Sequence, residues 1–237
     1  MNDQVSAKLK LMANPAELLY ETFKLWDSRI PTAVGTFDSY RSTHKDSATL
    51  DTHRRAVAYL NDIGTLLDVM ESDGKRVHAY RNRYENWIRT VFHFGGDWGG
   101  NAHPIDSHDL EVLENLIDAI DPYVPKLDSA KFEDLNAYLD KVEQAIDDDD
   151  TLPGVMRKTS KAFIQNLKTC IDNYTVIGDF QLKNAIERLL GHLAFIARQS
   201  KNSSMWKNIL NQFVFPYAVN QFPGIDLGEV ANAITNA

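Results

Sequence analysis

The most constraining feature of this 237-residue chain is the spacing of its apolar residues, which recur every three or four positions along most of its length. One such run consists of Leu135, Leu139, Val142 and Ile146. This spacing places the apolar side chains on one face of an α-helix, and that face has to be buried against another helix. No segment shows the sustained alternation with a period of two that is typical of a strand.

We therefore predict an all-α protein, a multi-helix bundle of about eight helices with no sheet. The first helix is predicted to begin at Asn14-Pro15, because asparagine caps a helix N-terminus and proline suits the first helical position. Four glycines and a proline between residues 94 and 105 exclude a helix there, so we predict a glycine-rich loop. A helix capped by Asp106 or Ser107 is predicted to follow that loop.

The formal net charge of −8 is unevenly distributed along the chain. Residues 106–150 hold 3 basic and 15 acidic residues, whereas residues 155–207 hold 9 basic and 3 acidic residues. We expect these two segments to face each other, either within the fold or in a dimer, and partly to neutralise their charges.

Four consecutive aspartates at 147–150, followed by Pro153-Gly154, form the clearest break in the pattern, and we interpret them as a solvated acidic turn. Two organisations are consistent with this break. Residues 1–150 form an acidic helical subdomain with the glycine-rich loop 94–105, and residues 151–237 form a basic and apolar helical subdomain. Alternatively, the whole chain forms one continuous domain.

Composition restricts the possible locations and partners of the protein. The chain has no run of about 18 apolar residues, so we predict no transmembrane segment, and the absence of a signal-peptide core predicts a cytoplasmic location. An acidic chain repels phosphate, which disfavours nucleic acid as a partner. A single cysteine, Cys170, excludes an intrachain disulfide and a cysteine-based zinc site.

The best candidate for a ligand-binding site surrounds the glycine-rich loop, where histidines, aspartates and an arginine cluster in the sequence. Its candidate residues are Arg89, His93, Asp97, Trp98, His103 and His108. A glycine-rich loop can wrap closely around a ligand, and the helix beginning near Asp106 offers backbone N–H groups to an anion. The alternative is a surface loop after a solvated helix face, on which Glu85 and Arg89 form an ion pair four positions apart.

The spacing of these residues matches no metal-ligand motif, and no nucleophile motif or phosphate-binding loop occurs. We therefore predict neither a metal nor a cofactor and assign no catalytic residue. The preferred interpretation is a non-catalytic, soluble helical protein that acts through protein–protein interaction in a regulatory, antitoxin-like or immunity-like role. The alternative is a hydrolase or nuclease that acts on a phosphodiester or nucleotide through the Arg/His/Asp cluster at residues 89–108.

Two surfaces are candidates for the predicted protein contact. The acidic segment 106–150 is suited to a basic partner. The segment 205–222 is mostly apolar, with Lys207 as its only charged residue. Such a segment forms a core helix, a surface for a protein partner or for self-association, or a helix at a membrane surface.

Overall fold

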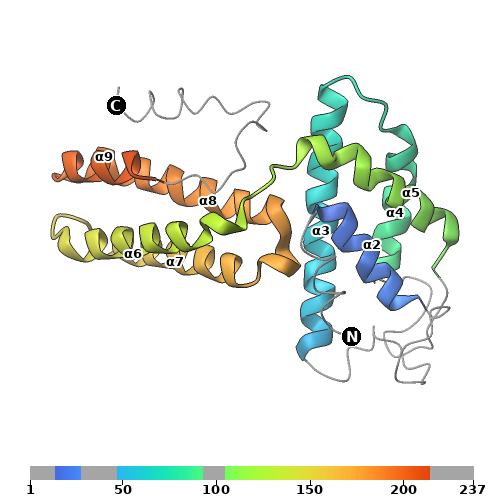
Figure 1. Cartoon of the computed structure of the whole chain (residues 1–237), viewed down its shortest axis with the longest axis horizontal. Helices are drawn as coiled ribbons and strands as arrows, with labels where there is room; N and C mark the ends of the chain where they lie inside the picture. The colour runs from blue at the N-terminus through green and yellow to red at the C-terminus, as the bar shows by residue number, and fades with distance from the viewer. Residues whose placement is uncertain (1–13, 28–46, 93–104, 214–237) are drawn as a thin grey trace. The chain divides into compact units, whose positions relative to one another are not determined.

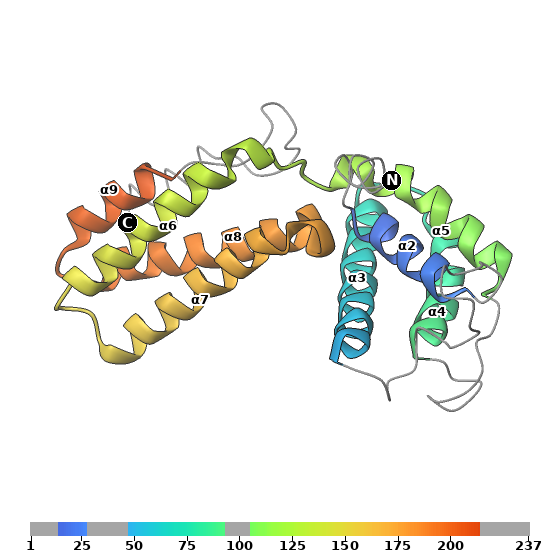
Figure 2. The same cartoon turned by 60° about the horizontal axis from the view of Figure 1, so that its bottom comes forward.

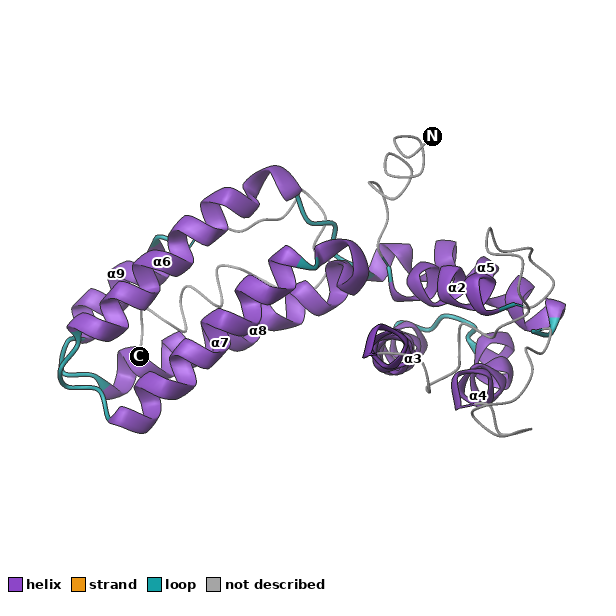
Figure 3. Cartoon of the chain, turned by 90° about the horizontal axis from the view of Figure 1, so that it is seen from below, coloured by secondary structure: helices purple, strands orange, loops and turns teal. Residues whose placement is uncertain are grey.

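A computed structural model of the chain describes residues 14–27, 47–92 and 105–213 (Figure 1). Within these ranges the protein is all-α, with eight α-helices, two short 3-10 helices and no strand (Figure 3). This confirms the predicted fold class. The α-helices are α2 (Pro15–Trp26), α3 (Ser47–Ser72), α4 (His78–Phe92), α5 (Ser107–Ile120), α6 (Phe132–Asp148), α7 (Gly154–Asp172), α8 (Tyr174–Gln199) and α9 (Ser203–Asn211).

The chain forms two compact units, Met1–Val124 and Pro125–Ala237. The turn after α6, where the sequence predicts a subdomain boundary, therefore lies within the second unit. The physical reason is that the apolar stripe of α6 packs against α7, so both helices share one core. None of the helices in the described part of the chain is long and apolar enough to cross a membrane.

In the first unit, α2 contacts both α3 and α5, and α4 contacts the same two helices (Figures 1 and 2). The N-terminus of α2 is capped as predicted. Oδ1 of Asn14 accepts hydrogen bonds from the backbone N–H groups of Ala16 at 3.1 Å and Glu17 at 3.0 Å. Nδ2 of Asn14 donates to the carbonyl of Ile117 at 3.1 Å, so the same residue also ties α2 to α5.

The contact between α3 and α4 depends on a glycine. The hydroxyl of Tyr84 on α4 donates to the carbonyl of Leu60 on α3 at 2.6 Å. A Cβ atom at Gly64 would lie only 2.7 Å from that hydroxyl oxygen, closer than real Cβ atoms approach. Gly64 therefore permits Tyr84 to reach the backbone of α3.

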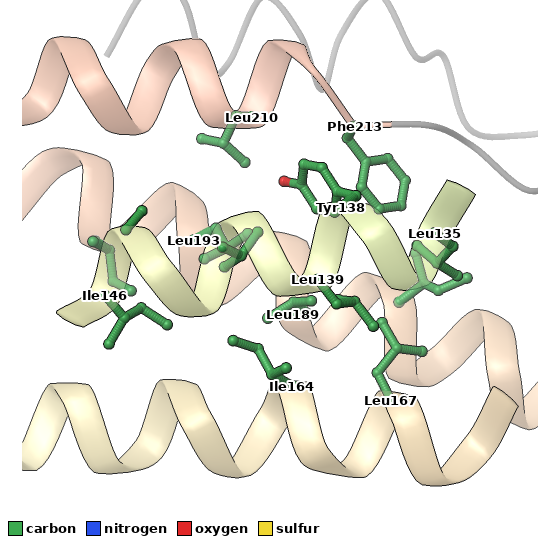
Figure 4. Close-up of a cluster of buried hydrophobic side chains, with 14 of the residues drawn as sticks. Leu135, Tyr138, Leu139, Ile146, Ile164, Leu167, Leu189, Leu193, Leu210 and Phe213 are labelled. Carbon is green, nitrogen blue, oxygen red and sulfur yellow. The ribbon is translucent and has the colours of Figure 1, made fainter. Parts of the chain in front are cut away.

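In the second unit, α6 packs on α7, α7 on α8 and α8 on α9, and their apolar stripes enclose one core (Figure 4). Helix α8 is kinked at Gly178, whose φ of 75° favours glycine. At this kink the carboxylate of Asp179 accepts hydrogen bonds from the hydroxyl of Tyr174 at 2.6 Å and from the backbone N–H of Leu127 at 3.2 Å. The buried aspartate thus fixes both the kink and the segment that leads into α6.

Candidate functional site

Two of the six predicted ligand-binding residues lie in the described part of the chain. Arg89 is on the exposed face of α4, where its Nη2 lies 2.6 Å from Oε1 of Glu85. This is the ion pair expected for a solvated helix face. His108 is exposed in the first turn of α5, and its Nδ1 lies 3.7 Å from Oε2 of Glu111. The remaining four, His93, Asp97, Trp98 and His103, lie outside the described residues.

Two backbone N–H groups at the start of α5 already bind a carboxylate of the same chain. Oδ1 of Asp106, the predicted cap, accepts hydrogen bonds from the backbone N–H groups of His108 at 2.8 Å and Asp109 at 3.3 Å. These bonds lower the pKa of Asp106, because they stabilise its charged form. A carboxylate of the chain thus already occupies these two N–H groups, and the predicted anion site at the start of α5 stays a prediction.

A second aspartate of this window, Asp109, is buried between α4 and α5. Its Oδ1 accepts hydrogen bonds from Nδ2 of Asn86 at 3.1 Å and Nη1 of Arg83 at 3.3 Å. Its backbone carbonyl accepts from Nε1 of the fully buried Trp87 at 3.0 Å. These contacts join the two helices, so Asp109 has a structural role. Among residues 14–27, 47–92 and 105–213, no group of three or more histidine, cysteine or acidic side chains could hold a metal ion.

The acidic and basic segments of the second unit meet, as their charges predict. Nζ of Lys161 on α7 lies 2.7 Å from Oδ1 of Asp147 on α6. Lys168 follows Lys161 by seven residues, about two turns of α7. Its Nζ lies 2.8 Å from Oδ1 of Asp140 and 3.1 Å from Oε2 of Glu143. The hydrogen bond to Asp140 is the main cause of the raised pKa of Lys168. These contacts confirm the prediction for the part of the acidic segment that forms α6, which faces the basic helix α7.

The turn after α6 contains a buried carboxylate that the sequence interpretation missed. Asp147, Asp148 and Asp150 are exposed, but Asp149 is 0% exposed, so the interpretation of a wholly solvated acidic turn is wrong for this residue. Four side chains donate to its carboxylate: Thr151 through Oγ1 at 2.6 Å, Ser200 through Oγ at 2.6 Å, Trp206 through Nε1 at 2.7 Å and Asn202 through Nδ2 at 2.9 Å.

The backbone N–H of Thr151 is a fifth donor to Asp149, at 3.0 Å. Burial by itself raises the pKa of this carboxyl, but the hydrogen bonds from Ser200, Thr151 and Trp206 outweigh that effect and hold its pKa well below the ordinary range. The donors come from the α6–α7 turn, the α8–α9 connection and α9. Asp149 therefore joins three segments that are distant in the sequence.

A serine–histidine contact lies between α7 and α8, and it too is structural. Oγ of Ser160 is 2.9 Å from Nε2 of His192 and donates to the carbonyl of Met156 at 2.7 Å. Burial lowers the pKa of His192, and Phe163 lies against its ring, with 5.0 Å between the ring centroids. A nucleophilic serine has to reach its substrate, whereas Ser160 is 0% exposed.

The apolar segment 205–222 is described as far as Phe213. Trp206, Leu210 and Phe213 are buried in the core of the second unit. This part of the segment therefore forms core packing, the first of the three predicted alternatives. Residues 214–222 lie outside the described ranges, so the predicted contact surface there remains a prediction.

A set of exposed carboxylates runs along α6 and the turn that follows it. We define the α6 acidic face by the exposed side chains of Glu133, Asp134, Asp140, Asp147, Asp148 and Asp150. Glu133, Asp140 and Asp147 are spaced by seven residues, about two helical turns, so they share one side of α6.

Comparison with known protein families, curated proteins and solved structures finds no match to this chain.

Proposed function

We propose that the protein is a soluble, cytoplasmic, non-catalytic binding protein that contacts a basic protein partner through the α6 acidic face. The observation that carries this proposal is that the carboxylates of the acidic segment 106–150 differ in burial. Asp109 and Asp149 are buried and accept hydrogen bonds from their own chain, whereas the members of the α6 acidic face are exposed to solvent. Exposed charge of one sign attracts a partner of the opposite sign and speeds association.

The lysines of α7 neutralise only one edge of this face. Asp140 and Asp147 are paired with Lys168 and Lys161. Among the described residues, no ion pair involves Glu133, Asp134 or Asp150. These three side chains are therefore the best candidates for direct contact with lysines and arginines of a partner. Such a contact suits a regulatory or neutralising role toward a basic protein.

The test is to recover protein partners with the full-length chain and then to measure the binding of each purified partner by isothermal titration calorimetry. We expect the double variant Glu133→Gln/Asp134→Asn to bind about tenfold more weakly than the wild type. We also expect wild-type affinity to fall as the salt concentration rises.

The control is the double variant Asp118→Asn/Asp172→Asn, which removes two exposed carboxylates elsewhere and changes the net charge equally. It should retain wild-type affinity. Equal weakening by both double variants would reject the α6 acidic face as the docking surface. Recovery of no direct protein partner would reject the proposed function itself.

A further inference from the structure

Helix α9 is short, and it is held to the rest of the second unit by apolar packing on α8 and by a polar link to one buried carboxylate. It spans nine residues, Ser203–Asn211, and an isolated helix of that length is not stable in water. In the described part of the chain α9 packs mainly against α8. Its stability as a helix therefore depends on the contacts that hold it against the bundle.

The main polar contact of α9 is with Asp149. Nε1 of the fully buried Trp206 donates to Oδ2 of Asp149 at 2.7 Å. The connection that precedes α9 is held by the same carboxylate, through Ser200 at 2.6 Å and Asn202 at 2.9 Å. The side chain of Asp149 thus binds both α9 and the connection between α8 and α9.

The core beneath the end of α9 contains a polar group without a hydrogen bond. The hydroxyl of Tyr138 is buried and has no hydrogen-bond partner among the described residues. The Tyr138 ring packs edge-on against Phe213, with 5.0 Å between the centroids (Figure 4). A buried hydroxyl that lacks a partner is unfavourable, because it has lost its hydrogen bonds to water. Detachment of α9 and Phe213 would return this hydroxyl to solvent, which reduces the free-energy cost of opening.

We propose that α9 is a strap that detaches as a unit from the bundle of α6, α7 and α8, held closed by Asp149 and pushed toward opening by the Tyr138 hydroxyl. Local opening of this kind occurs in proteins with a lower free energy than global unfolding. Helix α9 contributes no residue to the α6 acidic face, although Asp149, which holds it, lies between Asp148 and Asp150 of that face.

The test is native-state hydrogen exchange of the full chain, followed by mass spectrometry of peptides that cover α9 and α7. In the wild type we expect α9 amides to exchange faster than α7 amides. Trp206→Phe keeps an aromatic ring but removes the N–H donor to Asp149, so it should speed α9 exchange at least tenfold and α7 exchange much less. Tyr138→Phe removes the hydroxyl and should slow α9 exchange several-fold.

The matched control is Trp87→Phe, which removes an indole donor in the first unit and should leave α9 exchange unchanged. Equal protection of α9 and α7 in the wild type would overturn the proposal. It would also be overturned if Trp206→Phe accelerated both helices equally, or if Tyr138→Phe failed to slow α9. The Tyr138→Phe arm keeps the proposal testable if Trp206→Phe does not fold.

Discussion

Replacing Asp149 with alanine is expected to lower the free energy of unfolding of the second unit by about 3–5 kcal/mol. The substitution removes the acceptor for five hydrogen bonds, two of which come from the buried residues Ser200 and Trp206 and three from the half-buried Thr151 and Asn202. Among these donors, the indole N–H of Trp206 is buried most deeply, since that residue is 0% exposed. Urea denaturation followed by circular dichroism measures the loss.

The sequence itself supplies the controls for this prediction. Asp148 and Asp150 flank Asp149, carry the same charge and are exposed. Asp148→Ala and Asp150→Ala should each change the free energy of unfolding by about 0.5 kcal/mol or less. A loss in Asp149→Ala no larger than in these two variants would show that the hydrogen-bond network around Asp149 does not stabilise the fold.

Replacing Trp87 with alanine is expected to destabilise the first unit by a comparable amount, about 3–5 kcal/mol. Trp87 is 0% exposed, and the substitution leaves a large cavity between α4 and α5. It also removes the donor to the carbonyl of Asp109. Because the chain forms two compact units, the unfolding transition of the second unit should be unchanged. Two-dimensional NMR spectra recorded along a urea titration separate the two transitions.

Phe92→Ala is the control for this variant, because Phe92 is an aromatic residue at the end of the same helix that is 37% exposed. Its effect should be much smaller than that of Trp87→Ala. If Trp87→Ala shifted the unfolding of both units equally, the chain would unfold as one cooperative domain, and the division between Val124 and Pro125 would have no thermodynamic meaning.

The sequence predicts the helices well because their signals are local. The stripe of Leu135, Leu139, Val142 and Ile146 sets the buried face of α6 without reference to any other part of the chain. The cap at Asn14 likewise involves only the next three residues. Such signals lie within one or two helical turns and can be read from spacing alone.

The buried polar residues were harder to predict, although their positions gave a signal. Asp149 lies three residues after Ile146 and continues the apolar stripe of α6. Asp109 lies four residues before Leu113 and occupies the same kind of position on α5. A polar residue at a stripe position indicates burial, and a buried carboxylate needs donors. The donors of Asp149 include Ser200 and Trp206, 51 and 57 residues away in the sequence, and spacing could not identify them.

The ion pairs of α4 also show that spacing identifies contact partners only within one helix. The four-residue spacing of Glu85 and Arg89 correctly predicts their ion pair, because both residues lie on one helix. By contrast, Arg81 could have paired with Glu85 by the same spacing, but it pairs with Asp68 and Glu71 at the end of α3. The choice between these partners depends on how α3 and α4 pack, which is a tertiary property.

The most direct test of the division between buried and exposed carboxylates is a ¹³C NMR titration of the carboxyl groups of Asp147 to Asp150 in the full chain. We predict that Asp149 keeps its charge well below the ordinary aspartate pKa of 3.8, because its hydrogen bonds favour the charged form. Asp149 then stabilises the fold above that ordinary value, and this contribution is lost as the pH falls toward its lower pKa in the folded state. Titration of Asp149 at or above the ordinary value would contradict a buried, fully hydrogen-bonded carboxylate at this position.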